Sequence, residues 1–367
     1  MRVLIAGGGT AGHVFPALAL ARRLAAEGHE IRFVGTPRGQ EAKLVPAAGF
    51  PFVEVEARPF VRRPSARALT APIATARSIR GLRPLVEGCD VVVGMGGYVS
   101  VPTAVAAVRG RRPLVLHEQN AVPGLANRVL ARGARSVGLS FAEAARAFPR
   151  RTGTVVTGNP VREDIVAVET DRERLAKIGF HELQLAPDKR TVVVFGGSQG
   201  ALHLNRSAVD AVRHLDRDDV QVLLLTGPAH HERVLHTLRP SPGVQVGALA
   251  FLERMELAYA VADLVVARAG ASTMAEITVC GLPSLLVPYP YATARHQEAN
   301  ARALQRAGGA SVLLDEELDG PVLAERIVGL LDEEGRLRAM AERARAWSRP
   351  DAAEALAALV LEAGRDA

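Results

Sequence analysis

The chain has 367 residues, a formal net charge of +6 and 48% hydrophobic residues. This balance is ordinary for a globular protein and gives length enough for two domains with separate cores. It excludes a low-complexity chain or a disulfide framework, since only 2 cysteines occur. The positive charge, which comes almost entirely from arginine, favours an anionic partner such as a phosphate, a nucleic acid or an acidic membrane surface.

The amino terminus begins directly with an apolar strand and lacks the long apolar core and cleavage site of a signal peptide. No run approaches the roughly 20 apolar residues that a membrane-spanning helix needs. Metal-ligand spacing does not occur along the sequence either. We therefore expect a soluble or peripheral protein of the cytoplasm, without a metal site.

The first predicted strand, Arg2 to Ala6, runs into GGGTAGH, and helical spacing follows from Phe15 to Ala25. The glycines at 7, 9 and 12 match G-x-G-x-x-G, the dinucleotide fingerprint, in the strand-to-helix context that it requires. The fingerprint also expects an acidic residue after the second strand, but the predicted strand from Glu30 to Val34 ends in Gly-Thr-Pro. A nicotinamide-dependent oxidoreductase is therefore a weakened alternative, although a nearby arginine could bind a 2′-phosphate.

His13 closes this glycine-rich loop where a helix begins. A histidine at a helix start can simply cap or contact the backbone. Because an unperturbed imidazole titrates near neutral pH, His13 can also act as a general base toward a ligand held by the loop.

The segment from Ala57 to Val86 contains no acidic residue and seven arginines interleaved mainly with aliphatic residues. Helical spacing begins near Ser65. Such a pattern suits a solvated basic face, or an interfacial helix on an anionic bilayer. Nucleic acid is not expected as the partner, because base stacking needs aromatic planes. The arginines of this segment are Arg58, Arg62, Arg63, Arg67, Arg77, Arg80 and Arg83.

Two further predicted strands of the first half end in loops that are glycine-rich or polar. The strand from Asp90 to Gly94 runs into GMGGYVSVP, which places Tyr98 in a second glycine-rich loop. The strand from Pro113 to Leu116 runs into His117-Glu118-Gln119-Asn120. Because the carboxyl ends of parallel strands share one edge of a sheet, both loops are expected beside His13, where ligands bind. An ordinary polar loop is the alternative for the second.

The pattern changes at TGNPVRED, and the charged residues 163–187 are loosely patterned. We therefore expect one domain over residues 1–160 and a second over 161–345. The second half restarts like the first, because RTVVVF precedes the glycine-rich loop from Gly196 to Gly200 and a helix. Helices rich in Ala, Glu and Arg end the chain, and the last one, about residues 346–367, is expected to pack back on the first domain.

The stretch from Ala262 to Asn300 contains two consecutive strand-to-helix junctions. A strand from Leu264 to Ala267 leads through small residues into a short helix. A second strand, from Leu282 to Val287, leads into a helix that carries His296, Gln297 and Asn300. Free N–H groups at a helix start favour an anion, so the block resembles a site for a nucleotide diphosphate.

Seven motifs occur in the order found in the MurG family of bacterial peptidoglycan N-acetylglucosaminyltransferases: GGTAGHVFPALALA, GMGGYVSVP, HEQNAVPG, GNPVR, FGGSQGA, RAGASTMAE and HQEANA. The resemblance spans nearly the whole chain. It implies an α/β protein with the GT-B fold, in which two Rossmann-like domains with parallel sheets face a central cleft. It also implies an inverting enzyme that moves GlcNAc from UDP-GlcNAc to the C4 hydroxyl of the MurNAc-pentapeptide carried on undecaprenyl diphosphate (lipid I), giving lipid II, without a cofactor.

The resemblance also assigns roles to residues. His13 is the hypothetical base, with Glu118 and Tyr98 as helpers that orient it or the acceptor. Glu276 is assigned to the ribose hydroxyls of the donor, although T-x-x-E before an apolar turn also predicts a capping box with Thr273. The assigned donor contacts are Thr10, Ala11, Gly12, Asn120, Arg162, Ser198, Leu252, Ala271, Ser272, Thr273, Met274, Ala275, Glu276 and Gln297.

The expected partners are UDP-GlcNAc, lipid I and the anionic inner leaflet of the plasma membrane, so that the protein works at the cytoplasmic face; cell-wall or division proteins stay open as partners. Two residues depart from the family pattern, since Ala11 and Val101 stand where many members have glycine. Besides the oxidoreductase, the alternatives are another GT-B enzyme that moves a UDP-sugar to a lipid acceptor, and a nucleotide-sugar binding protein without catalysis.

Overall fold

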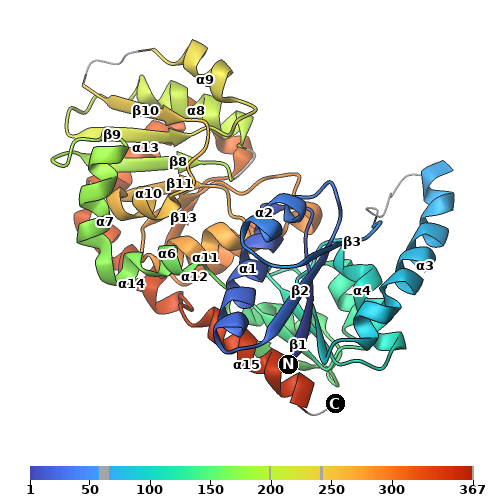
Figure 1. The fold of residues 1–367 in the computed structure, drawn as a ribbon. Helices are drawn as coiled ribbons and strands as arrows, with labels where there is room; N and C mark the ends of the chain where they lie inside the picture. The colour runs from blue at the N-terminus through green and yellow to red at the C-terminus, as the bar shows by residue number, and fades with distance from the viewer. Residues whose placement is uncertain (58–65, 198–199, 240–242, 366–367) are drawn as a thin grey trace. The chain divides into compact units, whose positions relative to one another are not determined.

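The computed structural model describes all residues except 58–65, 198–199, 240–242 and 366–367. It divides into two compact units (Figure 1). The first unit comprises Met1–Arg162 and Pro350–Ala367, and the second comprises Glu163–Arg349. The chain therefore leaves the first unit once and returns to it with its last helix.

The first unit is built on a sheet of seven parallel strands. The strands are almost continuously apolar, as expected for a parallel sheet that is covered on both faces. Along the sheet they follow one another as β3 (Phe52–Glu54), β2 (Glu30–Gly35), β1 (Arg2–Ala6), β4 (Val91–Gly94), β5 (Leu114–Glu118), β6 (Ser136–Leu139) and β7 (Gly153–Val156).

Helices cover both faces of this sheet because alternate residues of a strand point to opposite sides. Val3 and Ile5 of β1 pack with α1 (Ala11–Ala26), α2 (Glu41–Ala47) and the last helix of the chain, α15 (Ala352–Arg365). Leu4 and Ala6 pack with α3 (Ala66–Glu87), α4 (Ser100–Arg109) and α5 (Leu125–Leu130) on the other face. A 3-10 turn, η1 (Ala142–Ala147), follows β6.

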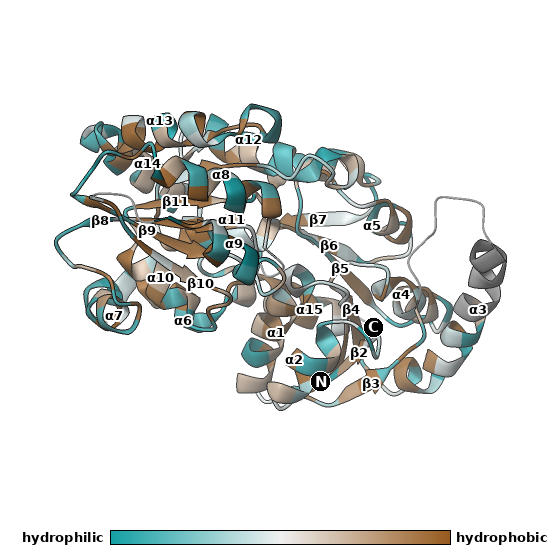
Figure 2. Ribbon diagram, turned by 90° about the horizontal axis from the view of Figure 1, so that it is seen from above, coloured by the Kyte–Doolittle hydropathy of each residue, from teal (hydrophilic) through white to brown (hydrophobic). Residues whose placement is uncertain are grey.

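The second unit contains a sheet of six parallel strands. Figure 2 shows that the strands of both units are mainly hydrophobic. In the second sheet they follow one another as β10 (Gln245–Leu249), β9 (Val220–Leu225), β8 (Arg190–Phe195), β11 (Leu264–Ala267), β12 (Ser284–Leu286) and β13 (Ala310–Val312).

The core on one face of the second sheet joins the strands to four helices: α8 (Leu202–Val212), α9 (His231–Thr237), α13 (Gly320–Leu331) and α14 (Glu334–Trp347). A separate helical layer contains α7 (Val168–Glu182), which packs against α10 (Met255–Val261). The remaining elements are α6 (Glu163–Val166), α11 (Ala271–Val279), η2 (Thr293–Arg295), α12 (His296–Arg306) and η3 (Asp315–Glu317).

The strand order of each sheet reverses at one point, between β1 and β4 in the first unit and between β8 and β11 in the second. Ligands of doubly wound sheets bind at such a reversal, outside the carboxyl ends of the strands. In the first unit the loops after β1 and β4 meet there, and both are glycine-rich. In the second unit the reversal lies between the loop after β8 and the start of α11.

The predicted fold class of two α/β domains with parallel sheets is confirmed. Three details differ from the expectations. Helix α1 begins at Ala11 instead of Phe15, β3 and β13 were not expected, and the loosely patterned residues after 163 form α6 and α7. Of the helices in the described part of the chain, none is long and apolar enough to cross a membrane.

Candidate active site

His13 lies in the first turn of α1, immediately after the glycine-rich loop that ends β1. The loop reverses direction at Gly9, whose φ of +88° is a conformation that glycine adopts readily. Thr10 then adopts an extended conformation as the N-cap of α1. The His13 backbone N–H donates to the Thr10 carbonyl oxygen over 3.1 Å, and its Nδ1 lies 3.5 Å from Thr10 Oγ1. The half-buried imidazole is thereby fixed at the carboxyl edge of the sheet.

The second glycine-rich loop, after β4, lies directly against the first. Gly96 and Gly97 both have positive φ, at +87° and +76°. A methyl group on Gly96 would lie 3.2 Å from Nε2 of His13, and one on Gly97 would lie 2.7 Å from the Gly8 carbonyl oxygen. The imidazole therefore packs on bare backbone. The ring of Tyr98 lies beside Gly9, so the structure brings His13 and Tyr98 to one place.

Glu118 ends β5 and is almost completely buried, with 2% exposure. Its Oε1 accepts from the backbone N–H of Asn120 over 3.1 Å. Its Oε2 accepts from Asn127 Nδ2 over 2.9 Å and from the Gly124 N–H over 3.0 Å. Burial raises the pKa of the Glu118 carboxyl, against the effect of these hydrogen bonds. Both oxygens are thus used to hold the loop that carries Asn120, a coherent structural role for a predicted helper.

His117 and Gln119 connect the end of β5 to its neighbours. The Nε2 of His117 lies 2.9 Å from the Gly158 carbonyl oxygen, after β7. Complete burial lowers the pKa of this imidazole to about 4, so it is neutral at pH 7 and Nε2–H is the donor. Gln119 Nε2 donates to the Met95 carbonyl oxygen over 2.6 Å, in the loop after β4. The polar cluster predicted from sequence therefore connects the end of β5 by hydrogen bonds to the loops that follow β4 and β7.

Arg162 is the residue at which the chain leaves the first unit, and its guanidinium lies 5.4 Å from the centre of the Phe15 ring in α1. This contact holds the arginine on the helix that carries His13. The predicted contacts of the first unit thus gather at the carboxyl edge of its sheet: Thr10, Ala11, Gly12, Asn120 and Arg162.

In the second unit, six of the predicted donor residues, from Ala271 to Glu276, lie in the first two turns of α11. Gly270 is the N-cap, and Ala271, Ser272 and Thr273 form the first turn. Because the N–H groups of a first turn have no intrahelical acceptor, this end presents donors and a partial positive charge. The capping box between Thr273 and Glu276 is wrong, since the helix begins two residues before Thr273. Met274 is buried, and Ala275 is half-buried.

Glu276 occupies the second turn of α11 and is held by a residue that the sequence did not single out. The hydroxyl of Tyr259, in α10, donates to Glu276 Oε2 over 2.7 Å. Tyr259 is completely buried, and its ring contacts that of Phe195 edge-on at 6.1 Å. The Glu276 carboxylate is therefore oriented by the rigid, buried side chain of Tyr259.

The loop between β12 and α12 is fixed by Gln297, whose Oε1 accepts from the Tyr289 backbone N–H over 2.9 Å. Asn300 Nδ2 donates to the Ala269 carbonyl oxygen over 3.1 Å, which joins α12 to the loop before α11. Leu252 follows β10 and is half-buried. Ser198 lies outside the described residues. Gln297 and the α11 region are thus connected through Asn300, on the same helix.

Arg268, between β11 and α11, is a buried cation with 6% exposure that sequence reasoning also missed. It donates to the carbonyl oxygens of Val287 and Pro288, forms an ion pair with Asp315 at 2.5 Å, and lies 5.7 Å from the centre of the Tyr289 ring. These contacts join the ends of β11 and β12, the two strands whose loops carry the predicted donor residues.

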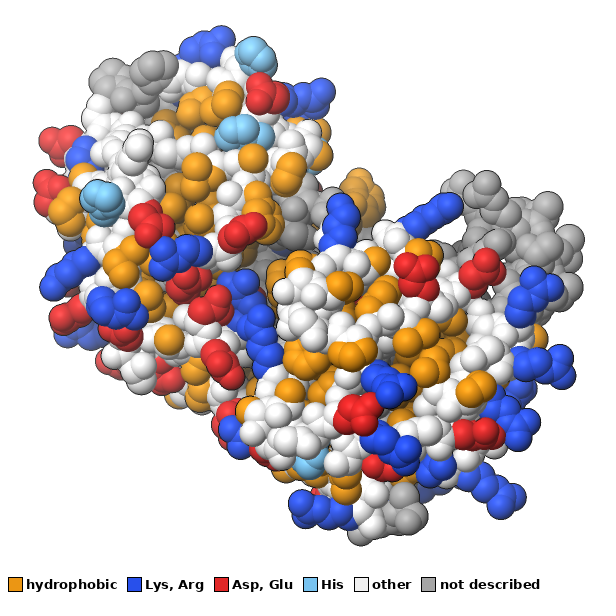
Figure 3. All heavy atoms as spheres, viewed as in Figure 1, with side chains coloured by type: hydrophobic (Ala, Val, Ile, Leu, Met, Phe, Trp, Pro, Cys, Tyr) orange, Lys and Arg blue, Asp and Glu red, His pale blue; other side chains and the backbone are white. Residues whose placement is uncertain are grey.

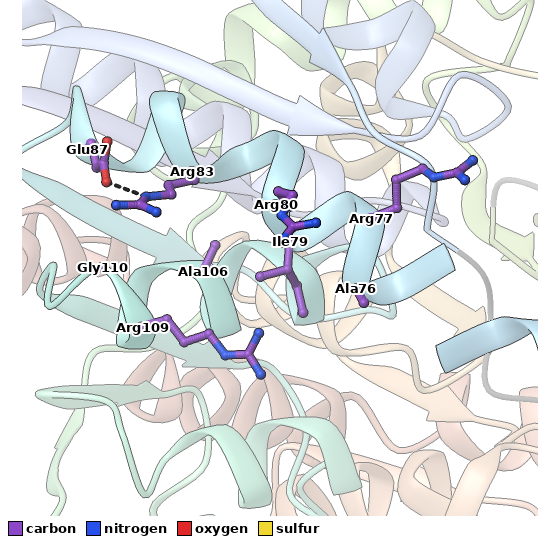
Figure 4. Close-up of a pocket in the computed structure, with 9 residues that line it drawn as sticks. All are labelled: Ala76, Arg77, Ile79, Arg80, Arg83, Glu87, Ala106, Arg109 and Gly110. Carbon is purple, nitrogen blue, oxygen red and sulfur yellow. Dashed lines mark hydrogen bonds and ion pairs between the residues drawn. The ribbon is translucent and has the colours of Figure 1, made fainter. Parts of the chain in front are cut away.

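Basic side chains gather along the side of the first unit where α3 lies (Figure 3). A groove of about 830 Å³ is lined by residues of α3 and of α4 with its C-cap Gly110 (Figure 4). Its only described acid, Glu87, is paired with Arg83 over 2.6 Å. Arg77, Arg80 and Arg109 are the other cations of its lining. Exposed apolar side chains accompany it on α4 and α5: Val108, Leu125 and Val129.

Comparisons with known proteins agree over the whole chain. Residues 3–139 match the glycosyltransferase family 28 N-terminal domain, and residues 191–356 match the corresponding C-terminal domain. The UDP-N-acetylglucosamine--N-acetylmuramyl-(pentapeptide) pyrophosphoryl-undecaprenol N-acetylglucosamine transferase of Halothermothrix orenii is 42% identical, over 98% of each chain. The enzyme of the same name from Moorella thermoacetica is 43% identical, over 99% of each. The crystal structure of Acinetobacter baumannii MurG has a TM-score of 0.78 at 28% identity, covering 98% of this chain and 99% of that one.

The chain belongs to the MurG family. The resemblance inferred from its motifs is thereby confirmed, and so is the prediction of a glycosyltransferase. In this member of the MurG family, the structure gathers His13, Tyr98 and the Glu118 loop in the first unit, and Glu276, Gln297 and the start of α11 in the second. Among the described residues, no group of three or more His, Cys, Asp and Glu side chains is placed to hold a metal ion.

Proposed function

We propose that this chain is the inverting transferase that moves GlcNAc from UDP-GlcNAc to the C4 hydroxyl of the MurNAc-pentapeptide on undecaprenyl diphosphate, converting lipid I to lipid II. The observation that carries the proposal is the identity of about 40% over nearly the full length with transferases of that name. The first unit would receive the acceptor, and most of the proposed donor contacts belong to the second.

In this reaction the acceptor O4 attacks the anomeric carbon of GlcNAc, a new C–O bond forms on the opposite face, and the bond to UDP breaks with its electron pair on the diphosphate. The O4 proton must leave during the attack. His13 is the proposed base, because its imidazole is fixed at the sheet edge between two glycine loops. A positioned base of this kind contributes roughly 10²- to 10⁴-fold to the rate.

Tyr98 and Glu118 are proposed to support this step. Tyr98 packs beside Gly9, in the loop that carries His13, so it is placed to orient the base or the acceptor. Glu118 acts less directly, because its oxygens hold the loop that carries Asn120.

The donor is proposed to bind with its ribose on Glu276, where a carboxylate oriented by Tyr259 can accept hydroxyl hydrogen bonds. The leaving diphosphate would lie at the start of α11, whose N–H groups and dipole favour negative charge by up to about 2 kcal/mol. Gln297, Leu252 and Ser198 complete the proposed set in the second unit. Thr10, Ala11, Gly12, Asn120 and Arg162 are the proposed donor contacts of the first.

The groove between α3 and α4 is proposed to rest on the anionic inner leaflet of the plasma membrane. Arg77, Arg80 and Arg109 supply charge, and the neighbouring Val108, Leu125 and Val129 supply apolar contact. Each arginine near such a surface contributes about 1 kcal/mol. A lipid-linked acceptor would thereby meet the enzyme at the bilayer.

The test is a transfer assay with radiolabelled UDP-GlcNAc and a short-chain lipid I analogue, with UDP-GalNAc and a phospholipid lacking the sugar as controls. The proposal expects a disaccharide product with UDP-GlcNAc and the sugar-bearing acceptor, and inverted configuration at the new bond. Binding of UDP-GlcNAc without turnover would identify a nucleotide-sugar binding protein. Quenching or enhancement of NADH or NADPH fluorescence, with no transfer, would support the oxidoreductase.

A further inference from the structure

Glu41, the first residue of α2, is a completely buried carboxylate beneath the loop that carries His13. Its Oε2 accepts from the Gly9 backbone N–H over 2.8 Å. Its Oε1 accepts from the Thr36 backbone N–H over 3.0 Å and from Thr36 Oγ1 over 2.8 Å. One side chain therefore joins the loop after β1 to the loop after β2.

The chain makes room for this carboxylate with glycines from three places. A methyl group would lie 2.3 Å from a Glu41 side-chain atom if it were on Gly8, 2.4 Å if it were on Gly35, and 2.0 Å if it were on Gly39. Such distances are far below van der Waals contact. Glycine at these positions is thus required by the position of Glu41.

The charge of Glu41 is met by neutral donors. In the part of the chain that the structure describes, no lysine, arginine or histidine pairs with it. Burying a carboxylate without a counter-ion is costly, and three hydrogen bonds offset the cost only while the two loops keep this conformation. The carboxylate is therefore sensitive to movement of the first glycine loop, and the loop is fixed by the carboxylate.

Resting on the proposed function, we propose that Glu41 is a positioning residue for the transfer reaction. It fixes the Gly9 N–H, and Gly9 precedes the N-cap Thr10, whose carbonyl oxygen accepts from the His13 N–H. The orientation of the imidazole against Gly96 and Gly97 depends on this connection. The Gly9 N–H, being used internally, also does not serve the pyrophosphate of a dinucleotide, which is the role that the G-x-G-x-x-G pattern suggests.

The decisive variant is Glu41→Gln. It keeps the size of the side chain but replaces one acceptor oxygen with an NH2 group, which then faces a donor at Gly9 or at Thr36. We expect kcat to fall about tenfold to a hundredfold, because the loss concerns the base. A smaller rise in KM for UDP-GlcNAc should accompany it, because Thr10, Ala11 and Gly12 of the same loop are proposed donor contacts. In a His13→Ala background the same substitution should have little further effect on kcat, since its action on kcat passes through His13.

Asp90→Asn is the matched control. Asp90 also joins β4 to β1, by accepting from the Arg2 backbone N–H over 2.8 Å, but it does so at the opposite end of the strands. This variant should lower stability without changing kcat. Glu41→Asp is the second variant; its shorter carboxylate cannot span both loops, and we expect it to fold and to lose activity like Glu41→Gln.

Hydrogen exchange of the peptide covering residues 7–13 gives a readout independent of activity. The inference expects faster exchange at this peptide in Glu41→Gln and Glu41→Asp, and wild-type exchange in Asp90→Asn. Three results would each overturn the positioning role. They are a wild-type kcat in both Glu41 variants, an equally large fall in kcat when Glu41→Gln is made in the His13→Ala background, and unchanged exchange of the peptide covering residues 7–13. If the wild-type chain transfers no GlcNAc, the proposed function fails, whereas an active wild type with silent Glu41 variants refutes the positioning role alone.

Discussion

The hydroxyl of Tyr259 donates a hydrogen bond to Oε2 of Glu276 over 2.7 Å. Tyr259 belongs to α10 and Glu276 to α11, so the bond crosses between two helices on either side of β11 in sequence. The buried Tyr259 ring packs against Phe195 and has little conformational freedom. Its hydroxyl therefore holds the Glu276 carboxylate in one orientation. For the proposed role of accepting ribose hydroxyls this preorganisation is favourable, because the entropy of fixing the rotamer of the carboxylate is lost on folding and not on binding.

Tyr259→Phe is therefore expected to weaken the donor complex. Loss of the hydroxyl removes a charge-assisted hydrogen bond from Glu276, and we expect KM for UDP-GlcNAc to rise about threefold to tenfold, with a smaller change in kcat. Initial rates at saturating acceptor measure this. Tyr291→Phe removes a hydroxyl from a side chain that is 83% exposed, and it should leave KM unchanged. If Tyr259→Phe also adds its full effect to Glu276→Gln, then the two side chains do not act together.

His13→Ala is expected to lower turnover at least about a hundredfold while leaving the affinity for UDP-GlcNAc nearly intact, because a general base acts on the acceptor in the transition state. Single-turnover rates and donor binding by calorimetry separate the two quantities. His214→Ala, which alters an exposed histidine of the second unit, is the control. Full activity in the His13 variant would remove the base assignment.

Replacing Arg77, Arg80 and Arg109 together by serine is expected to reduce binding to vesicles rich in anionic lipid roughly a hundredfold, at about 1 kcal/mol for each arginine. Co-sedimentation at low and at physiological salt measures this. The matched control replaces three exposed arginines of the same unit that do not line the groove, Arg22, Arg32 and Arg38, and so removes the same charge. Two outcomes would contradict the proposed docking face. Vesicle binding could be independent of lipid charge and salt concentration, or it could fall equally in both triple variants.

Much of the fold could be predicted from the sequence because strands buried in a parallel sheet are continuous apolar runs, each ending in a glycine-rich or polar loop. Strands β3 and β13 escaped prediction because each has three residues, too few to show a pattern, and β3 is largely half-exposed. Helix α1 begins earlier than its apolar spacing suggests, because the glycine-rich loop closes before Ala11 and that residue already belongs to the first turn.

The candidate site was predictable where function depends on short sequence patterns, such as the glycine loops and the small residues before α11. Glu41 and Tyr259 were not predicted, since the partners that connect them to the site, Gly9 and Glu276, lie 32 and 17 residues away in sequence and no fixed spacing marks them. Tyr259 stands in an apolar helix and has the pattern of an ordinary core residue. Thr273 and Glu276 show the opposite failure, because a capping pattern occurs inside a helix that begins at Ala271.

The pH dependence of stability tests the buried hydrogen bond between His117 and the Gly158 carbonyl oxygen in the first unit. His117 has a pKa of about 4 in the folded chain because it is completely buried, against an ordinary value of 6.5. As the pH falls below 6.5, His117 becomes protonated in the unfolded chain but stays neutral in the folded chain until about pH 4. Because the unfolded chain then binds more protons, the free energy of unfolding decreases across this window. Between pH 7.5 and pH 5 the loss is about 2 kcal/mol.

His117→Gln keeps an N–H donor for the Gly158 carbonyl oxygen but cannot titrate, so it should lose about 2 kcal/mol less stability than the wild type over the same interval. Urea unfolding at both pH values, followed by circular dichroism, measures the difference. The raised pKa of Glu118 acts in the opposite direction, but it is present in both proteins and cancels in the comparison. His236→Gln, at an exposed position, should follow the wild type. Equal losses in His117→Gln and the wild type would mean that the imidazole is accessible to protons in the folded chain, and the brace between β5 and β7 would then open at mildly acidic pH.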